Sequence, residues 1–197
     1  MRTQTAAAPT TGDADKRDAI LDAALALFAE RTFDGTPVPL IAERAGVGAG
    51  TIYRYFDDKA ALVNGLYQYW KMAMAARLTP ASPMGDARAE FHHWWDGLWR
   101  FASEHPDAFA FLETQHHQAY LDARSHAMGE AIVSAAAAYV RRAQAAGAVR
   151  RARPEMLIAL VFGAFTGLVK AAGEDGLTYR KKDVATSEEC AWAMLRA

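Results

Sequence analysis

The sequence predicts an all-α protein, in which an N-terminal unit of three helices is joined to a larger helical domain. Hydrophobic residues make up 52% of the 197-residue chain, so it can bury a substantial core. Alanine is frequent throughout, whereas Gly and Pro cluster at a few points, which favours helices separated by short connections. Apolar residues recur at helical spacing, and no stretch keeps the alternation of a strand.

The first third of the chain predicts a mobile tail followed by three helices. Residues 1–14 mix Ala, Thr, Gly and Pro without periodicity, and helical spacing of apolar residues starts after Asp15. Thr36 suits an N-cap, and Pro37 suits the first helical position, where the missing N–H costs nothing. Gly46 can adopt the positive φ of a tight turn. The expected helices span 15–31, 37–45 and 48–55.

The remaining chain predicts longer helices. Only Gly65 weakens the helix that begins at Lys59, and Pro80 ends it. The expected helices span 59–79, 86–104, 106–117, 119–146 and 154–172, with a short final one from 187. We therefore divide the chain into a tail (1–14), a three-helix domain (15–64) and a larger helical domain (65–197).

Composition limits the cellular location. The single cysteine, Cys190, cannot form an intrachain disulfide, and the start of the chain lacks the apolar segment of a signal peptide. We expect a cytoplasmic protein. The longest apolar run, 156–169, is shorter than a membrane span and contains two glycines, so we interpret it as a buried helix and expect no membrane contact.

Charge gives no support for binding to nucleic acid. The formal net charge is −1, and the first sixty residues contain nine Asp and Glu against seven Lys and Arg. Any contact with phosphate must therefore come from a local group of residues.

The most informative segment is 36–62, TPVPLIAERAGVGAGTIYRYFDDKAAL. It has the order helix, glycine turn, short helix, aromatic pair and lysine at a new helix start, which is the pattern of a helix-turn-helix. The short helix can enter a major groove because its exposed face is small or polar. The runs IAERAGV and TIYRYF, followed by Lys59 and Leu62, resemble the DNA-binding domain of the TetR family over residues 16–65.

The candidate DNA-binding residues belong to this short helix and its borders. Small residues at its start keep the approach to DNA close, and Arg54 can read guanine through O6 and N7. Tyr53 and Tyr55 carry hydroxyls on rigid arms that can reach phosphates, and Lys59 adds an ammonium at a helix start. The resemblance implies phosphate contacts at Tyr53, Lys59 and Thr36. The full set is Thr36, Ala49, Gly50, Thr51, Tyr53, Arg54, Tyr55 and Lys59.

Two positions depart from the usual pattern of the family, and one alternative stays open. Gly48 stands where the family usually has a Ser or Thr cap, and Tyr55 where it often has His. Gly is a tolerable cap and Tyr can donate to phosphate, so the fold expectation is unchanged, while the operator sequence is left undetermined. The alternative is that the aromatics of this segment only fill the core, as we expect for Phe56.

A row of small side chains lies in the predicted helix 154–172. Ala159, Gly163, Gly167 and Ala171 recur at helical spacing, so another helix can approach closely. That helix can belong to the same subunit or to a second one. Members of the resembled family pair their last two long helices into a four-helix bundle, which implies a homodimer through the C-terminal helices.

Aromatic residues and histidines crowd the two predicted helices that follow residue 86. Trp95 and Trp99 are one turn apart on the same face. In the resembled family this region encloses an effector pocket, which implies a small-molecule effector, apolar or aromatic, held by a few polar groups. The candidate pocket residues are Trp95, Trp99, Phe111 and His117. Each of them can also be part of the ordinary core.

Two Glu and His pairs at i, i+3 spacing suggest a rival class, a di-iron carboxylate oxidoreductase with a helical bundle. The pairs are Glu90 with His93 and Glu113 with His116. Such a centre needs two further carboxylates, and Glu130 and Glu155 are poorly placed to provide them. The rival also leaves the helix-turn-helix pattern unexplained.

The sequence thus predicts a DNA-binding transcriptional regulator, with no catalytic site, metal or cofactor. We expect a ligand-released repressor that binds a palindromic operator in double-stranded DNA as a homodimer. The repressing sign comes from the resemblance alone.

Overall fold

The computed structural model describes residues 11–31, 33–82, 84–113, 118–174 and 178–197. Within these ranges the regular structure is helical and contains no strand, which confirms the predicted class. The α-helices are α1 (Thr11–Glu30), α2 (Val38–Arg44), α3 (Ala49–Tyr55), α4 (Lys59–Leu78), α5 (Ala87–Glu104), α6 (Pro106–Glu113), α7 (Ala123–Ala145), α8 (Pro154–Glu174) and α9 (Lys181–Leu195). A 3₁₀ turn, η1 (Gln118–Tyr120), precedes α7.

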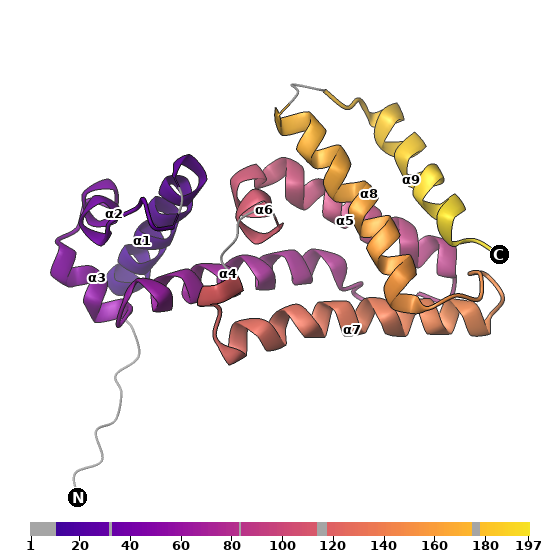
Figure 1. Ribbon diagram of the computed structural model, residues 1–197, viewed down its shortest axis with the longest axis horizontal. Helices are drawn as coiled ribbons and strands as arrows, with labels where there is room; N and C mark the ends of the chain where they lie inside the picture. The colour runs from indigo at the N-terminus through magenta and orange to yellow at the C-terminus, as the bar shows by residue number, and fades with distance from the viewer. Residues whose placement is uncertain (1–10, 32, 83, 114–117, 175–177) are drawn as a thin grey trace, which may run out of the picture.

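Helices α1, α2 and α3 pack together at one end of the molecule, and we call residues 11–55 the head (Figure 1). Their apolar faces meet in a core to which Leu27, Ile41 and Ile52 each contribute a fully buried side chain. The turn between α2 and α3 has the predicted chemistry: Gly46 has a φ of +67°, and Val47 packs against the core beneath it. The head therefore has the geometry of a helix-turn-helix unit.

Two predicted boundaries in the head are wrong. Helix α1 begins at Thr11 instead of Asp15, so the tail predicted for 1–14 ends earlier, and residues 1–10 lie outside the described residues. Thr36 is not the N-cap of α2, because Pro37 holds that position. The Thr36 side chain is fully buried, and its hydroxyl donates to the carbonyl oxygen of Leu27 at 3.5 Å.

Helix α4 follows the head and packs with the helices that come after it. We call residues 59–195, which include α4, the body. Asp58 caps α4 by accepting a hydrogen bond from the amide of Ala61 at 2.7 Å. Helices α5 and α7 both pack along α4, α8 crosses between α7 and α9, and α9 lies against α5 (Figure 1). Helix α6 packs against α1, so the body touches the head through α6 as well as through α4.

Two predicted helix starts in the body are wrong, and one predicted helix end lies outside the described residues. The described part of α6 ends at Glu113, and the predicted last turn lies outside the described residues. Helix α7 starts at Ala123 instead of residue 119, because the Asp122 carboxylate accepts the amide of Ser125 at 2.7 Å and sets the cap there. Helix α9 starts at Lys181 instead of residue 187, where the Asp183 carboxylate accepts the backbone N–H of Arg180.

Helix α8 is apolar but exposed along one face, so the expectation of a buried helix is wrong for the single subunit. Its segment 154–173 has a mean hydropathy of 1.8 over its most apolar window, of which only 11% is buried. Met156 and Leu160 are each about half exposed, and a Cβ added at Gly163 or Gly167 would meet no atom within 4 Å. Length and composition alone would let this helix cross a membrane.

Candidate nucleic-acid interface and ligand pocket

Helix α3 presents the predicted recognition face to solvent. Its buried Ile52 anchors it to the core, and Gly48 at the N-cap has an extended backbone. On the outer side, Ala49, Gly50 and Arg54 are exposed. Tyr53 is 54% exposed, although a tyrosine is usually more buried than this. Thr51, between these two groups of residues, is half-buried. The exposed face of α3 thus combines small residues at its start with hydroxyl and guanidinium groups at its end.

An acidic residue of α1 holds the end of this face. The Tyr55 hydroxyl donates to the Asp13 carboxylate at 2.9 Å, and a guanidinium nitrogen of Arg54 lies 3.9 Å from the same oxygen. Desolvation, together with this hydrogen bond, raises the pKa of Tyr55, so its hydroxyl remains a donor. Sequence reasoning missed Asp13 because it was assigned to the mobile tail.

Lys59 begins α4 as predicted, but its ammonium turns toward the head. It donates to the carbonyl oxygen of Phe33 and lies 4.0 Å from the centroid of the Phe33 ring. Desolvation lowers the pKa of Lys59. A phosphate contact requires this side chain to leave Phe33. The buried Thr36 has no side-chain surface for phosphate, so that expectation is wrong for this conformation.

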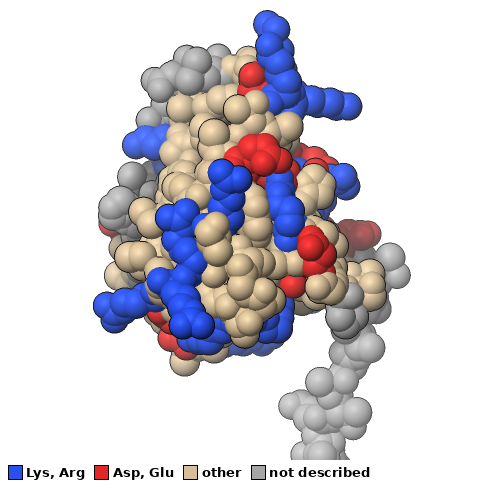
Figure 2. Space-filling model, turned by 90° about the vertical axis from the view of Figure 1, so that its right-hand side faces the viewer, with Lys and Arg blue, Asp and Glu red and all other residues tan. Residues whose placement is uncertain are grey.

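Basic side chains gather at the end of the molecule opposite the head (Figure 2). Exposed arginines of this end, around the connection from α7 to α8, are Arg141, Arg142, Arg150, Arg151 and Arg153. Arg141 and Arg142 pair with Glu155 and Glu90, whereas no ion pair joins Arg151 or Arg153 to any described residue. This group of arginines lies far from α3, so contacts of the head with DNA depend on the residues of the head itself.

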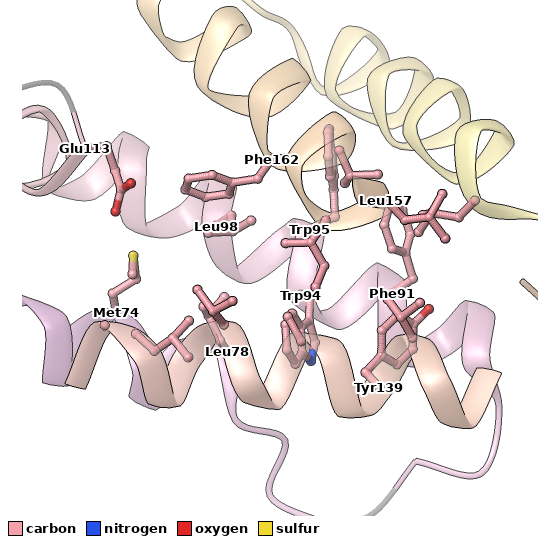
Figure 3. A pocket seen from close by; sticks show the side chains of 18 of the residues that line it. Met74, Leu78, Phe91, Trp94, Trp95, Leu98, Glu113, Tyr139, Leu157 and Phe162 are labelled. Atoms are coloured by element: carbon pink, nitrogen blue, oxygen red, sulfur yellow. The ribbon is translucent and has the colours of Figure 1, made fainter. Parts of the chain in front are cut away.

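The body contains an apolar pocket of about 200 Å³ that is formed mainly by α4, α5, α7 and α8 (Figure 3). Its wall is made by Met74 and Leu78 of α4, Phe91, Trp94, Trp95 and Leu98 of α5, Ile132, Val133 and Tyr139 of α7, and Leu157, Ile158 and Phe162 of α8. The Tyr139 hydroxyl already donates to the carbonyl oxygen of Ala87 at 2.8 Å, and burial raises its pKa. The indole N–H groups of Trp94 and Trp95 have no partner among the described residues.

One end of the pocket carries a buried ion pair. Lys71 of α4 donates to the carboxylate of Glu113, the last residue of α6, at 2.7 Å. The two side chains are only 10% and 14% exposed, and both line the pocket. Figure 3 shows Glu113 and Met74 at this end and Phe91 with Tyr139 at the other. The polar end of the pocket thus lies where α6 ends.

The predicted pocket residues have different outcomes. Trp95 lines the pocket. Trp99 instead packs edge-on against Phe165 of α8 and against Tyr179, with centroids 5.3 and 5.6 Å away. Phe111 is also outside the pocket wall and faces α1, and His117 lies outside the described residues. Helical spacing shows which residues share a face but not which neighbouring helix that face meets.

The pocket residues that sequence reasoning missed come mostly from α4, α7 and α8. Lys71 carries a usable signal, because a lysine within the apolar spacing of a helix needs a buried partner. Nothing in the local pattern identifies that partner as Glu113, which is 42 residues away along the chain.

Three carboxylates of the rival di-iron centre, Glu90, Glu113 and Glu155, are engaged in separate ion pairs. Glu90 pairs with Arg142 at 2.7 Å, Glu113 with Lys71 and Glu155 with Arg141 at 3.2 Å. His116 lies outside the described residues, and among those described no three His, Cys, Asp or Glu side chains gather as metal ligands do. The described residues of this rival centre are therefore not brought together.

The fold and the exposed face of α3 define a helix-turn-helix protein with a helical C-terminal domain. Two family models match the chain: bacterial regulatory proteins of the tetR family over residues 20–71, and the tetracyclin repressor-like C-terminal domain over residues 73–197. The chain belongs to the TetR family of transcription regulators.

Individual relatives agree with this assignment. Over 55 residues the chain is 42% identical to the HTH-type transcriptional repressor KstR2 of Rhodococcus jostii, which is 28% of this chain and 27% of that protein. It is 40% identical over 70 residues to the repressor KstR of the same organism, covering 32% and 33% of the two chains. The matches thus span about a third or less of these relatives. A TetR family regulator from Marinobacter aquaeolei shares the fold, with a TM-score of 0.84 and 24% identity over 94% of this chain and 97% of that one.

Proposed function

We propose that the protein is a cytoplasmic repressor that binds a palindromic operator as a homodimer and leaves it when a small apolar molecule enters the pocket. The observation that carries this proposal is the position of α4. It begins at Lys59 beside the recognition helix and lines the pocket with Met74 and Leu78. A ligand that moves α4 therefore moves the head. The candidate reading residues are Tyr53, Arg54 and Tyr55, with Lys59 available once it leaves Phe33.

The exposed apolar face of α8 supports a dimer. Leu160, Gly163 and Gly167 are open in the single subunit and follow one another at helical spacing. The missing side chains at the two glycines let a second helix approach closely. We assign this face to a second copy of the chain, because a dimer also provides the two-fold symmetry that a palindromic operator needs. A membrane would leave the DNA-reading face without a role.

We assign DNA binding to the predicted domain 15–64, and both dimerisation and effector binding to the predicted domain 65–197. Regulation by binding needs no chemistry, so we propose no enzymatic activity. The geometry of two heads then sets the operator, because two recognition helices fit successive major grooves only when about 34–36 Å apart.

Footprinting on DNA selected from the genome of origin tests the proposal. We expect protection of two symmetric half-sites whose centres lie about one helical turn apart. The stoichiometry should be an even number of subunits for each operator. Protection of a single asymmetric site, or selection of no sequence above the genomic background, would contradict the proposal.

A further inference from the structure

The polar end of the pocket restricts the chemistry of the effector. Lys71 and Glu113 neutralise each other at 2.7 Å, and both are largely removed from water. Buried charges of this kind are stable only while they remain paired and hydrogen-bonded. Apart from the indole N–H groups of Trp94 and Trp95, which have no partner among the described residues, the remaining lining of the pocket is apolar or has its polar group engaged, as Tyr139 does with Ala87. A ligand must therefore satisfy this ion pair or stay away from it.

Charged ligands fit this end poorly. A carboxylate that approaches Lys71 also meets the carboxylate of Glu113, and an ammonium that approaches Glu113 meets the ammonium of Lys71. Either arrangement leaves an excess buried charge. An uncharged group that is both donor and acceptor satisfies both partners, since its oxygen accepts from Lys71 while its O–H or N–H donates to Glu113. The indole N–H groups of the pocket favour an acceptor but do not discriminate between a hydroxyl and a carboxylate.

We propose that the effector is an uncharged, mainly apolar molecule whose hydroxyl or primary amide group inserts between Lys71 and Glu113. This inference rests on the proposed function and names the ligand class of the same pocket. Insertion separates the two charged groups and thus moves the end of α6 away from α4. Because α6 packs against α1, the same movement disturbs the contact between body and head.

A matched set of naphthalene derivatives, substituted at one ring carbon, tests this assignment by fluorescence titration of the full-length protein without DNA. The set is methylnaphthalene, naphthylmethanol, naphthamide, naphthoate and naphthylmethylammonium, whose two-ring frame suits a pocket of about 200 Å³. We expect the alcohol and the amide to bind roughly tenfold more tightly than the hydrocarbon, because they add hydrogen bonds to charged groups. The carboxylate and the ammonium should bind more weakly than the hydrocarbon.

Charge variants sharpen the test. Glu113→Gln leaves Lys71 without its counter-charge, so naphthoate should become the tightest ligand. Lys71→Met leaves Glu113 without its counter-charge, so naphthylmethylammonium should become the tightest ligand of that variant. The double variant Lys71→Met/Glu113→Leu replaces the pair by apolar groups, which proteins tolerate well, and should bind the alcohol no better than the hydrocarbon. If a single variant fails to fold by circular dichroism, the wild type and the double variant still decide the question.

The outcomes separate this inference from the proposed function. A wild-type protein that prefers the carboxylate or the ammonium, binds none of the set, or keeps its order of preference in the double variant overturns the inference. Operator binding without ligand is measured on the same preparations. If it is intact while the order of preference is absent, the inference fails and the proposed function stands; if the order is present and no operator is bound, the proposed function fails.

Discussion

Phe111 of α6 stacks on Phe28 of α1, with ring centroids 6.2 Å apart and an angle of 15° between the ring planes. Both side chains are fully buried. Phe28 in turn stacks on Phe33 at 6.0 Å, and Phe33 on Tyr120 of η1 at 4.0 Å. Phe28 and Phe33 of the head thus lie between two rings of the body. These are Phe111 of α6 and Tyr120 of η1. The stacked rings connect the pocket end of α6 to the head by a contact that does not involve α4.

Phe111→Leu should therefore weaken the release of DNA by a ligand more than it weakens DNA binding itself. We expect a loss of about 1 kcal/mol in the free energy of unfolding, since one aromatic contact is removed from a buried site. Operator affinity without ligand should change little, whereas a compound that releases the wild-type protein should release the variant less completely. The control is Phe109→Leu, which removes a ring that faces Phe165 of α8 instead of the head. Equal loss of release in both variants would contradict the coupling.

Arg54→Ala should cost on the order of 1–3 kcal/mol of operator binding, mainly at one base position, because it removes the proposed base contact. Arg151→Ala makes the same chemical change at the opposite end of the molecule and serves as the control. Binding titrations on operators with single base changes check the result. A uniform loss across all base positions would reassign Arg54 to phosphate, and equal losses in both variants would remove it from the interface.

Asp13→Asn should strengthen DNA binding and steepen its dependence on salt. The Asp13 carboxylate accepts the hydroxyl of Tyr55 and lies near Arg54, so we expect it to compete with DNA for both groups. Removing this negative charge beside the proposed interface should increase the slope of log affinity against log salt by roughly one. Asp15→Asn removes the same charge from an exposed site on α1 and should have a smaller effect. If Asp13→Asn instead weakens binding, Asp13 positions Arg54 and Tyr55 and does not compete for them.

Gly163→Leu should break the proposed dimer without unfolding the subunit. Beyond the neighbouring backbone of α8 itself, no described atom lies within 4 Å of a Cβ added there, so one subunit can accommodate the larger side chain. A close helix pair cannot, and overpacking of about 1–3 kcal/mol occurs on both sides of the two-fold axis. Sedimentation should show monomers with native helix content. Ala131→Leu adds a similar apolar side chain to an exposed site of α7 and should leave the dimer intact. A stable dimer of Gly163→Leu would place the interface elsewhere.

Features that depend on neighbours in the chain could be predicted from the sequence alone. The turn at Gly46 needs a positive φ, the start of α4 follows the cap at Asp58, and α5 ends where Pro106 begins the next helix. The exposed face of α3 was likewise predictable, because helical periodicity separates the buried Ile52 from the residues around it. The pattern TIYRYF identified the family for the same reason: its spacing is local.

Features that depend on partners distant in the chain were decided only by the tertiary structure. Periodicity placed Trp95 and Trp99 on one face, but the crossing of α8 put only Trp95 on the pocket wall. An apolar face predicts burial but does not indicate which element covers it. The sequence therefore predicts Phe111 in the pocket, although it packs on the head, and a buried α8, although its small residues are open. The pairing of Lys71 with Glu113 has the same origin, since attraction between charges depends on their separation in space and not along the sequence.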